Sequence, residues 1–269
     1  IKKAFKAKSD EMELEKLKRV DIERGALVSA IRYLVHELNT PLNGLNGSLQ
    51  ILEEYIEENS EEHDLIKMSL ESAGKLGRFV SAFNQYINIS PEDFSPRIAD
   101  IEKITLSALD RIELEMRQYG RENLKIEMRT EGRGPFECYA ETKVLQDSLR
   151  ECVLNSARRM ESGTIIVCIS EEADEVKLSV IDQGSGIEDK YKSRVFLPGG
   201  WSHDINYHSS IEDNPYEFGR SGYGFGLARI KKSIEMCGGR IDFDTEFGKG
   251  TSFFIFFPLN APGNKANNG

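Results

Sequence analysis

The stretch His36-Glu37-Leu38-Asn39-Thr40-Pro41 lies inside an apolar pattern that has the period of one long helix. Around it, apolar residues recur at steps of three and four, at Leu34, Leu38, Leu42, Leu45, Leu49, Leu52 and Ile56. The pattern predicts a rigid helix carrying a histidine, an adjacent carboxylate and a hydroxyl one turn further on. Because Pro41 lacks an N–H and its ring crowds the carbonyl of Glu37, we expect a kink just past the histidine. We interpret His36 as a phosphate-accepting histidine rather than a packed one.

A second helix is predicted to follow, so that the two helices form an antiparallel hairpin. Ser60 is typical of a helix N-cap, and the two glutamates after it complement the positive end of the next helix. One stripe of that helix carries Leu65, Met68, Ser72, Leu76, Phe79, Phe83 and Tyr86. A lone hairpin of this size cannot bury both stripes, whereas pairing with a second copy makes a four-helix bundle. We therefore expect a homodimer.

The rest of the chain predicts a second domain of mixed structure. Apolar periodicity predicts helices at about 101–116, 140–160 and 225–236. Strands are predicted at 124–128, 164–170, 176–181, 240–245 and 251–257. The expected fold is an α+β sandwich in which helices lie on one face of mostly antiparallel strands.

Five segments follow from these patterns. Residues 1–28 are charged and helix-prone, and they predict either a coiled-coil lead-in or a frayed, solvated tail. The dimerisation hairpin is expected over 29–90, a proline-punctuated linker over 91–97 and the second domain over 98–260. The last segment, 261–269, is rich in Asn, Gly and Pro and is expected to be disordered.

Composition narrows the class of protein. The 269 residues suit two domains, and the net charge of −10 argues against nucleic acid and anionic membrane surfaces as partners. No apolar run approaches the roughly 20 residues that span a bilayer. The charged opening, which starts at Ile1, indicates a fragment, so a membrane anchor is expected only through segments outside this chain. Four scattered cysteines indicate reduced thiols and a cytoplasmic location.

Two glycine-rich motifs in the second domain suit a nucleotide. Asp182 follows a predicted buried strand, where its carboxylate can accept a hydrogen bond from an exocyclic amine, and Gly184 and Gly186 let a flat ring approach the backbone. Alone, this motif is more often a calcium loop or an ordinary turn. The segment 222–227 opens a predicted helix whose free N–H groups suit a phosphate chain, although a flexible turn has the same composition.

A polar stripe on the 140–160 helix suits a metal ion. Glu151 and Asn155 are four residues apart, on one helical face, and both offer oxygen ligands of the kind that Mg²⁺ prefers. Arg158 lies on the same face and can meet phosphate. For such a pair seen in isolation, a solvated polar stripe is the more common arrangement. The composition of 248–251 is typical of a hairpin turn.

In their order and spacing, these elements resemble the sensor histidine kinases of two-component systems over roughly residues 20–258. His36 to Pro41 resembles the H box of that family, Glu151 to Asn155 lies where its N box lies, and Asp182 to Gly186 matches its G1 box. Arg194 to Pro198 is similar to the F box, Gly222 to Leu227 matches G2, and Gly248 to Thr251 resembles the last glycine box.

The resemblance implies an ATP-dependent kinase that phosphorylates its own His36 and passes the phosphoryl group to an aspartate of a response regulator. It implies an ATP-binding domain of the type shared with gyrase and MutL, in which Asp182 binds the adenine amine and Asn155, with Glu151, holds Mg²⁺. The remaining expected nucleotide contacts are Arg158, Gly184, Gly186, Ile187, Gly222, Gly224, Gly226, Leu227 and Thr251.

The resemblance also assigns the residues beside the histidine. Glu37 can accept or orient the other ring proton, and Asn39 and Thr40 can reach the same helical face as His36. In the family, this arrangement is associated with a phosphatase activity toward the response regulator, in which the threonine helps to place a water. We therefore expect the chain both to phosphorylate the response regulator and to remove phosphate from it.

Several residues depart from the family pattern. Glu151 stands where the family often has asparagine, Arg158 stands where it often has lysine, and 187–221 is long for a lid over the nucleotide. Because of these departures, a second hypothesis stays open. In it, the chain is a degenerate kinase that serves as an interaction module for another signalling protein. A third option is an ATPase that forms no phosphohistidine.

Overall fold

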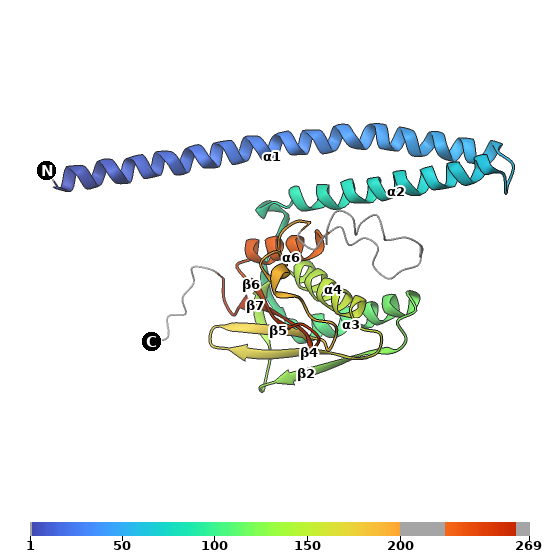
Figure 1. Cartoon of the computed structure of the whole chain (residues 1–269). Coiled ribbons are helices and arrows are strands. Elements are labelled where there is room, and N and C mark those ends of the chain that lie inside the picture. Colours follow the sequence, from blue (N-terminus) through green and yellow to red (C-terminus); the bar gives the residue numbers. More distant parts are fainter. Residues whose placement is uncertain (1, 200–223, 262–269) are drawn as a thin grey trace. The chain divides into compact units, whose positions relative to one another are not determined.

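The computed structural model describes residues 2–199 and 224–261, and for residues 2–24 it gives the helix without its side chains. The chain divides into two units, Ile1–Asn88 and Ile89–Gly269, each with its own internal contacts. Figure 1 shows the helical first unit and the mixed second unit. The predicted tail lies outside the described residues except for its first residue, and Gly222 and most of the 187–221 stretch also lie outside them.

The first unit is a hairpin of two helices, α1 (Lys2–Tyr55) and α2 (Glu61–Ile87). The charged lead-in and the histidine helix are one continuous element, and α1 passes through Pro41 with only a gentle bend (Figure 1). Asn59 turns the chain with a φ of 69°. The predicted cap is confirmed, because the Ser60 side chain accepts a hydrogen bond from the backbone N–H of His63.

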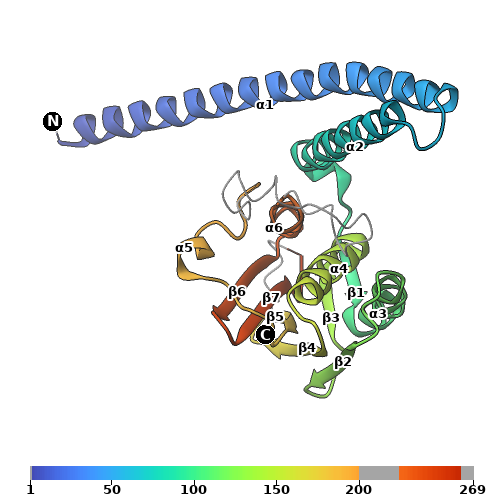
Figure 2. The same cartoon turned by 45° about the vertical axis from the view of Figure 1, so that its right-hand side comes forward.

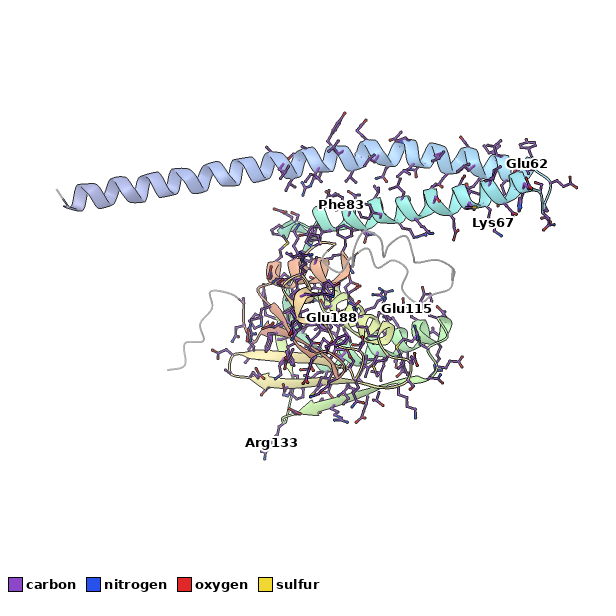
Figure 3. The ribbon with its side chains drawn as sticks, in the orientation of Figure 1. Glu62, Lys67, Phe83, Glu115, Arg133 and Glu188 are labelled. Atoms are coloured by element: carbon purple, nitrogen blue, oxygen red, sulfur yellow. The ribbon has the colours of Figure 1, made fainter. Side chains whose placement is uncertain are left out.

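The two helices meet along a seam that differs from the stripes seen in the sequence. The seam buries Val35 and Leu42 of α1 against Val80 and Ile87 of α2, with spacings of seven residues on each helix. Phe83 of α2, labelled in Figure 3, packs against this cluster. Most of the predicted stripes face outward instead, at Leu34, Leu38, Leu45, Leu52, Leu65, Met68 and Leu76. Each helix therefore has two neighbouring apolar faces, and one hairpin covers only one of them.

The second unit is built on a five-stranded sheet. Its strands are β2 (Leu124–Glu131), β4 (Gly163–Glu172), β5 (Glu175–Ile181), β7 (Gly250–Pro258) and β6 (Arg240–Glu246), side by side in that order. The β2–β4 pair is parallel and the other three pairs are antiparallel, which confirms the mostly antiparallel sheet.

Three helices cover one face of this sheet, α3 (Ile101–Gln118), α4 (Thr142–Arg158) and α6 (Gly226–Met236), as Figure 2 shows. The α+β architecture is thereby confirmed. The central helix α4 buries Leu145, Leu149 and Val153 completely. Its opposite face carries the polar stripe, because an amphipathic helix on a sheet leaves one side for solvent or a ligand.

Four short elements escape the sequence patterns. The strands β1 (Arg97–Asp100) and β3 (Glu137–Ala140) pair in a small antiparallel sheet. The others are the 3₁₀ turn η1 (Pro91–Asp93) and the single-turn helix α5 (Asp189–Lys192). The expected linker 91–97 thus contains η1 and the first residue of β1. Elements of three or four residues are too short to display a period.

Candidate functional site

His36 lies on the outside of the hairpin. Its side chain is 81% exposed, although the neighbouring Val35 is buried in the seam. Its Nδ1 is 3.7 Å from Oε1 of Glu37, close enough for electrostatic attraction but too long for a good hydrogen bond. Thr40 is also exposed, one turn further along α1, and Asn39 is half-buried toward the seam. The histidine is therefore presented to solvent on a rigid helix.

Asp182 lies in the second unit, where it directly follows β5 and is 4% exposed. Its Oδ2 accepts a hydrogen bond of 2.7 Å from the hydroxyl of Ser156 on α4. Its Oδ1 accepts from the backbone N–H of Gly184 at 2.9 Å and of Thr251 at 3.1 Å. Donors from three segments of the chain therefore fix this carboxylate as a buried, oriented acceptor.

Thr245 of β6 ties the loop after Asp182 to the last hairpin. Its Oγ1 accepts from the N–H of Ile187 at 3.0 Å and donates to the carbonyl of Gly250 at 2.9 Å. It also lies 3.1 Å from the hydroxyl of Thr251. The loop is held a second time, by the N–H of Gly248 donating to Ser185 O at 2.8 Å. The predicted hairpin turn at 248–251 therefore forms one wall of the site.

In the loop after Asp182, backbone atoms of the protein lie too close to Gly184 and Gly186 for larger residues to fit. Gly186 has a φ of 64°, and a Cβ there would overlap the carbonyl of Glu246. A Cβ on Gly184 would lie 2.8 Å from the carbonyl oxygen of Arg159. The sequence explained these glycines by the access that they give to a flat ring. The structure adds a second reason, which is the close approach of the protein's own backbone.

Glu151, Asn155 and Arg158 form a connected row on the polar face of α4. The Asn155 amide donates to Oε1 of Glu151 at 3.3 Å, and Nη1 of Arg158 donates to Oδ1 of Asn155 at 2.7 Å. The same Nη1 is 3.8 Å from Oε1 of Glu151. Oδ1 of Asn155 and Oε1 of Glu151 therefore both face the positively charged guanidinium of Arg158.

Burial affects the two arginines at the end of α4. It lowers the pKa of Arg158, and the nearby charge of Glu151 opposes that shift. Burial likewise lowers the pKa of Arg159, opposed by the charge of Asp182. The Arg158 Nε is buried and has no hydrogen-bond partner within the described part of the chain. An anionic ligand would satisfy it.

The N-terminus of α6 meets the α4 row. A Cβ on Gly226 would overlap the carboxylate of Glu151, so only glycine allows this approach. The first turn of α6 contains no acidic residue, and no described side chain caps it, so this end of the row carries helix N–H groups of the kind that attract anions. The side chains of Leu227 and Ile187 are buried in the core, so only their backbones are available to a ligand.

Gly224, two residues before α6, pairs with the backbone of Gly199. The N–H of Gly199 donates to the carbonyl of Gly224 at 3.0 Å, and a Cβ on Gly224 would lie 2.8 Å from Cα of Gly199. Just before this pair, Phe196 of the F-box-like segment packs edge-on against Phe243, with ring centroids 5.7 Å apart.

The structure thus brings those predicted site residues of the second unit that it describes into two adjoining groups. One group surrounds Asp182 and the other follows the polar face of α4. Ser156, which sequence reasoning missed, joins them, because it follows Asn155 and contacts Asp182. Thr245 was also missed. The sequence signal for Ser156 was its place directly after the asparagine, whereas nothing local marks Thr245.

Comparison with known proteins identifies both units. The family model described as "His Kinase A (phospho-acceptor) domain" matches residues 26–90. The model described as "Histidine kinase-, DNA gyrase B-, and HSP90-like ATPase" matches residues 140–261. The chain belongs to the sensor histidine kinases.

Curated sensor histidine kinases match most of the chain. Sensor histidine kinase ZraS of Escherichia coli (strain K12) is 25% identical over 229 residues, covering 84% of this chain and 44% of ZraS. Sensor protein SrrB of Staphylococcus aureus (strain NCTC 8325 / PS 47) is 28% identical over 234 residues, covering 83% of this chain and 36% of SrrB. The chain therefore spans less than half the length of these relatives.

Solved histidine kinases share the fold. The crystal structure of full-length ShkA in complex with AMPPNP superposes with a TM-score of 0.61 at 21% identity, covering 87% of this chain and 47% of ShkA. Acinetobacter baumannii histidine kinase AdeS gives a TM-score of 0.51 at 19% identity, covering 84% of this chain and 98% of that one. Across the described helices of this histidine kinase chain, none is both long and apolar enough to cross a bilayer.

In this histidine kinase, the hydroxyl of Thr245 is expected to stabilise the loop that carries Asp182. Thr245→Val keeps the side-chain shape but leaves the buried N–H of Ile187 without an acceptor, which should lower the free energy of unfolding by about 1–3 kcal/mol. Thr245→Ser keeps the hydroxyl and should lose less than about 1 kcal/mol. Urea denaturation measures both, and equal losses in the two variants would contradict this role of the hydroxyl.

Proposed function

We propose that this chain is the kinase core of a sensor histidine kinase, which transfers the γ-phosphoryl group of ATP to His36 and then to an aspartate of a response regulator. The observation that carries the proposal is the 81% exposed imidazole of His36, on a chain whose other unit holds the buried acceptor Asp182. A phosphoacceptor must be reachable by a separate nucleotide-bearing unit, and an exposed position on a helix provides that access.

The Asp182 group would bind the base of the nucleotide. Adenine carries an exocyclic amine, and the buried carboxylate is an acceptor oriented by three donors. The N-terminus of α6, with Gly224 and Gly226, would meet the phosphates, because helix N–H groups favour negative charge. Arg158, whose Nε has no described partner, would add a cation on the same side. Gly222 is proposed here from sequence alone.

Asn155 and Glu151 would hold Mg²⁺. Their oxygens are hard ligands of the type that Mg²⁺ prefers, and in this structure they already accept from or face the guanidinium of Arg158. When bound, the ion would neutralise charge on the phosphates. The protein would contribute the spacing of the two oxygens on one face of α4 and the nearby helix N-terminus.

The histidine side of the reaction depends on nitrogen as a nucleophile. A neutral imidazole keeps a lone pair on one ring nitrogen at neutral pH. Glu37, 3.7 Å from Nδ1, would favour the proton on that nitrogen, which leaves Nε2 to attack the γ-phosphorus as ADP departs. The same exposed position would give a receiver domain access to the phosphorylated ring.

Autophosphorylation is tested with γ-³²P-ATP. We expect wild type to take up label that is stable to alkali and lost in acid, and His36→Gln to fall to background. His63→Gln is the matched control, since His63 is a partly exposed histidine at the start of α2 and should leave labelling unchanged. Nucleotide binding without label in the wild type would favour the interaction-module hypothesis, and phosphate release unaffected by His36→Gln would favour an ATPase.

The exposed leucines indicate that the hairpin dimerises. Leu34, Leu38 and Leu45 are each at least half exposed, at 58%, 50% and 51%. Because a helix turns about 100° per residue, these leucines lie on one flank of Val35, while His36 and its neighbours Thr40 and Asn43 lie on the other. A second hairpin packed on the leucines would therefore complete a four-helix bundle and leave the histidine accessible.

Leu45→Glu should dissociate the dimer, because it places a charge in the apolar interface of the bundle. Light scattering after size exclusion is expected to give the monomer mass at micromolar concentration. Leu106→Glu is the control, since Leu106 is a leucine of similar exposure, 50%, on α3 of the other unit. A Leu45→Glu variant that stays dimeric would place the interface elsewhere.

We also propose that Thr40 serves the phosphatase direction. Its hydroxyl is exposed one turn beyond His36, where it could orient a water toward the phosphorylated receiver. Thr40→Ala should lower the rate of receiver dephosphorylation by on the order of tenfold to a hundredfold, while His36 labelling changes less than about twofold. Thr40→Ser should restore the rate. Equal loss of both activities in the alanine variant would assign Thr40 to the hairpin's structure instead.

A further inference from the structure

We propose that Ser156 determines the nucleotide-base preference of the site, by holding the Asp182 carboxylate with a single acceptor position open. The inference rests on the proposed contact between Asp182 and the base. Ser156 lies on helix α4, directly after Asn155, and is fully buried, whereas Asp182 directly follows strand β5 of the sheet. Their 2.7 Å hydrogen bond joins the helix of the polar row to the base pocket.

The acceptor positions of Asp182 can be counted. An ionised carboxylate has about four lone-pair positions, two on each oxygen. The N–H groups of Gly184 and Thr251 occupy both positions on Oδ1. The hydroxyl of Ser156 occupies one position on Oδ2. Among the residues that the structure describes, one position on Oδ2 therefore remains for a ligand, and its direction is set by the serine hydroxyl.

A single, oriented acceptor selects among bases. Adenine presents an N–H donor from its exocyclic amine, which can fill the open position. A base that presents a carbonyl oxygen there would place one acceptor against another, because neither its oxygen nor Oδ2 carries a hydrogen. A base without the amine would leave the open position on Oδ2 without a hydrogen-bond donor. Sites that hydrogen-bond a ligand group reject analogues lacking it, because their buried polar atoms are left unpaired.

Removing the serine hydroxyl should weaken this selection without emptying the site. In Ser156→Ala, Oδ2 would have two unfilled positions, and the carboxylate would be held only through Oδ1, by the N–H groups of Gly184 and Thr251. The contact with the amine would become one of several arrangements, whereas contacts to the phosphates would be unchanged. Ser156 is therefore a positioning residue, since it acts on the base through Asp182.

The chain contains a matched control for this change. Ser148 lies on the same helix α4, two turns before Ser156, and is equally buried. Its hydroxyl has no hydrogen-bond partner among the described atoms, so it makes no hydrogen bond to Asp182. Ser148→Ala thus makes the same chemical change in the same helix without altering the carboxylate.

The test compares the affinities of the full 269-residue chain for ATP and for purine riboside triphosphate, which lacks the amine. Calorimetric titration should show that wild type prefers ATP. Ser156→Ala should lower that preference roughly tenfold through weaker ATP binding, with the analogue's affinity unchanged. Ser148→Ala should keep the wild-type preference, and thermal melting checks the folding of each variant. Ser156→Cys keeps the shape with a weak S–H donor and should give an intermediate preference.

Each other outcome overturns the inference in a distinguishable way. An unchanged preference in Ser156→Ala, or equal weakening of both nucleotides, would show that Ser156 does not act on the base. If Ser156→Ala does not fold, the cysteine variant decides, and a wild-type preference there overturns the proposal. Failure of the wild type to bind either nucleotide would instead overturn the proposed function, and this inference with it.

Discussion

The buried carboxylate of Asp182 is the constraint on which the second unit depends. A charge removed from water must be compensated by hydrogen bonds, and here the donors come from α4, from the loop after β5 and from β7. These segments are distant in sequence, so the carboxylate is satisfied only when the helix layer and the sheet are assembled. The same arrangement that makes the anion tolerable also orients it toward a ligand.

The first unit differs from the second, because its apolar helices expose the polar side chain of His36 to solvent. Its helices have two adjacent apolar faces, and the hairpin buries only the seam around Val35 and Val80. The faces left exposed are separate from the flank that carries His36. Such a scaffold can therefore gain stability from a second copy without covering His36.

The sequence predicts the architecture well and the contacts poorly. Long periodic segments, such as α3, β4 and the final hairpin, were predicted because their patterns extend over many residues. The seam was not, since a period of three and four residues merges two neighbouring faces of one helix. Glycine motifs located the loop after β5, but Ser156 and Thr245 became visible only through their partners. A lone hydroxyl in a sequence carries no sign of which distant atom it will meet.

The backbone pairing between Gly199 and Gly224 has a consequence for how such domains diversify. These two glycines lie far apart in the sequence, and a backbone hydrogen bond of 3.0 Å joins them directly, so each fixes the position of the other. Insertions and deletions accumulated over generations at this place would not shift the register of α6.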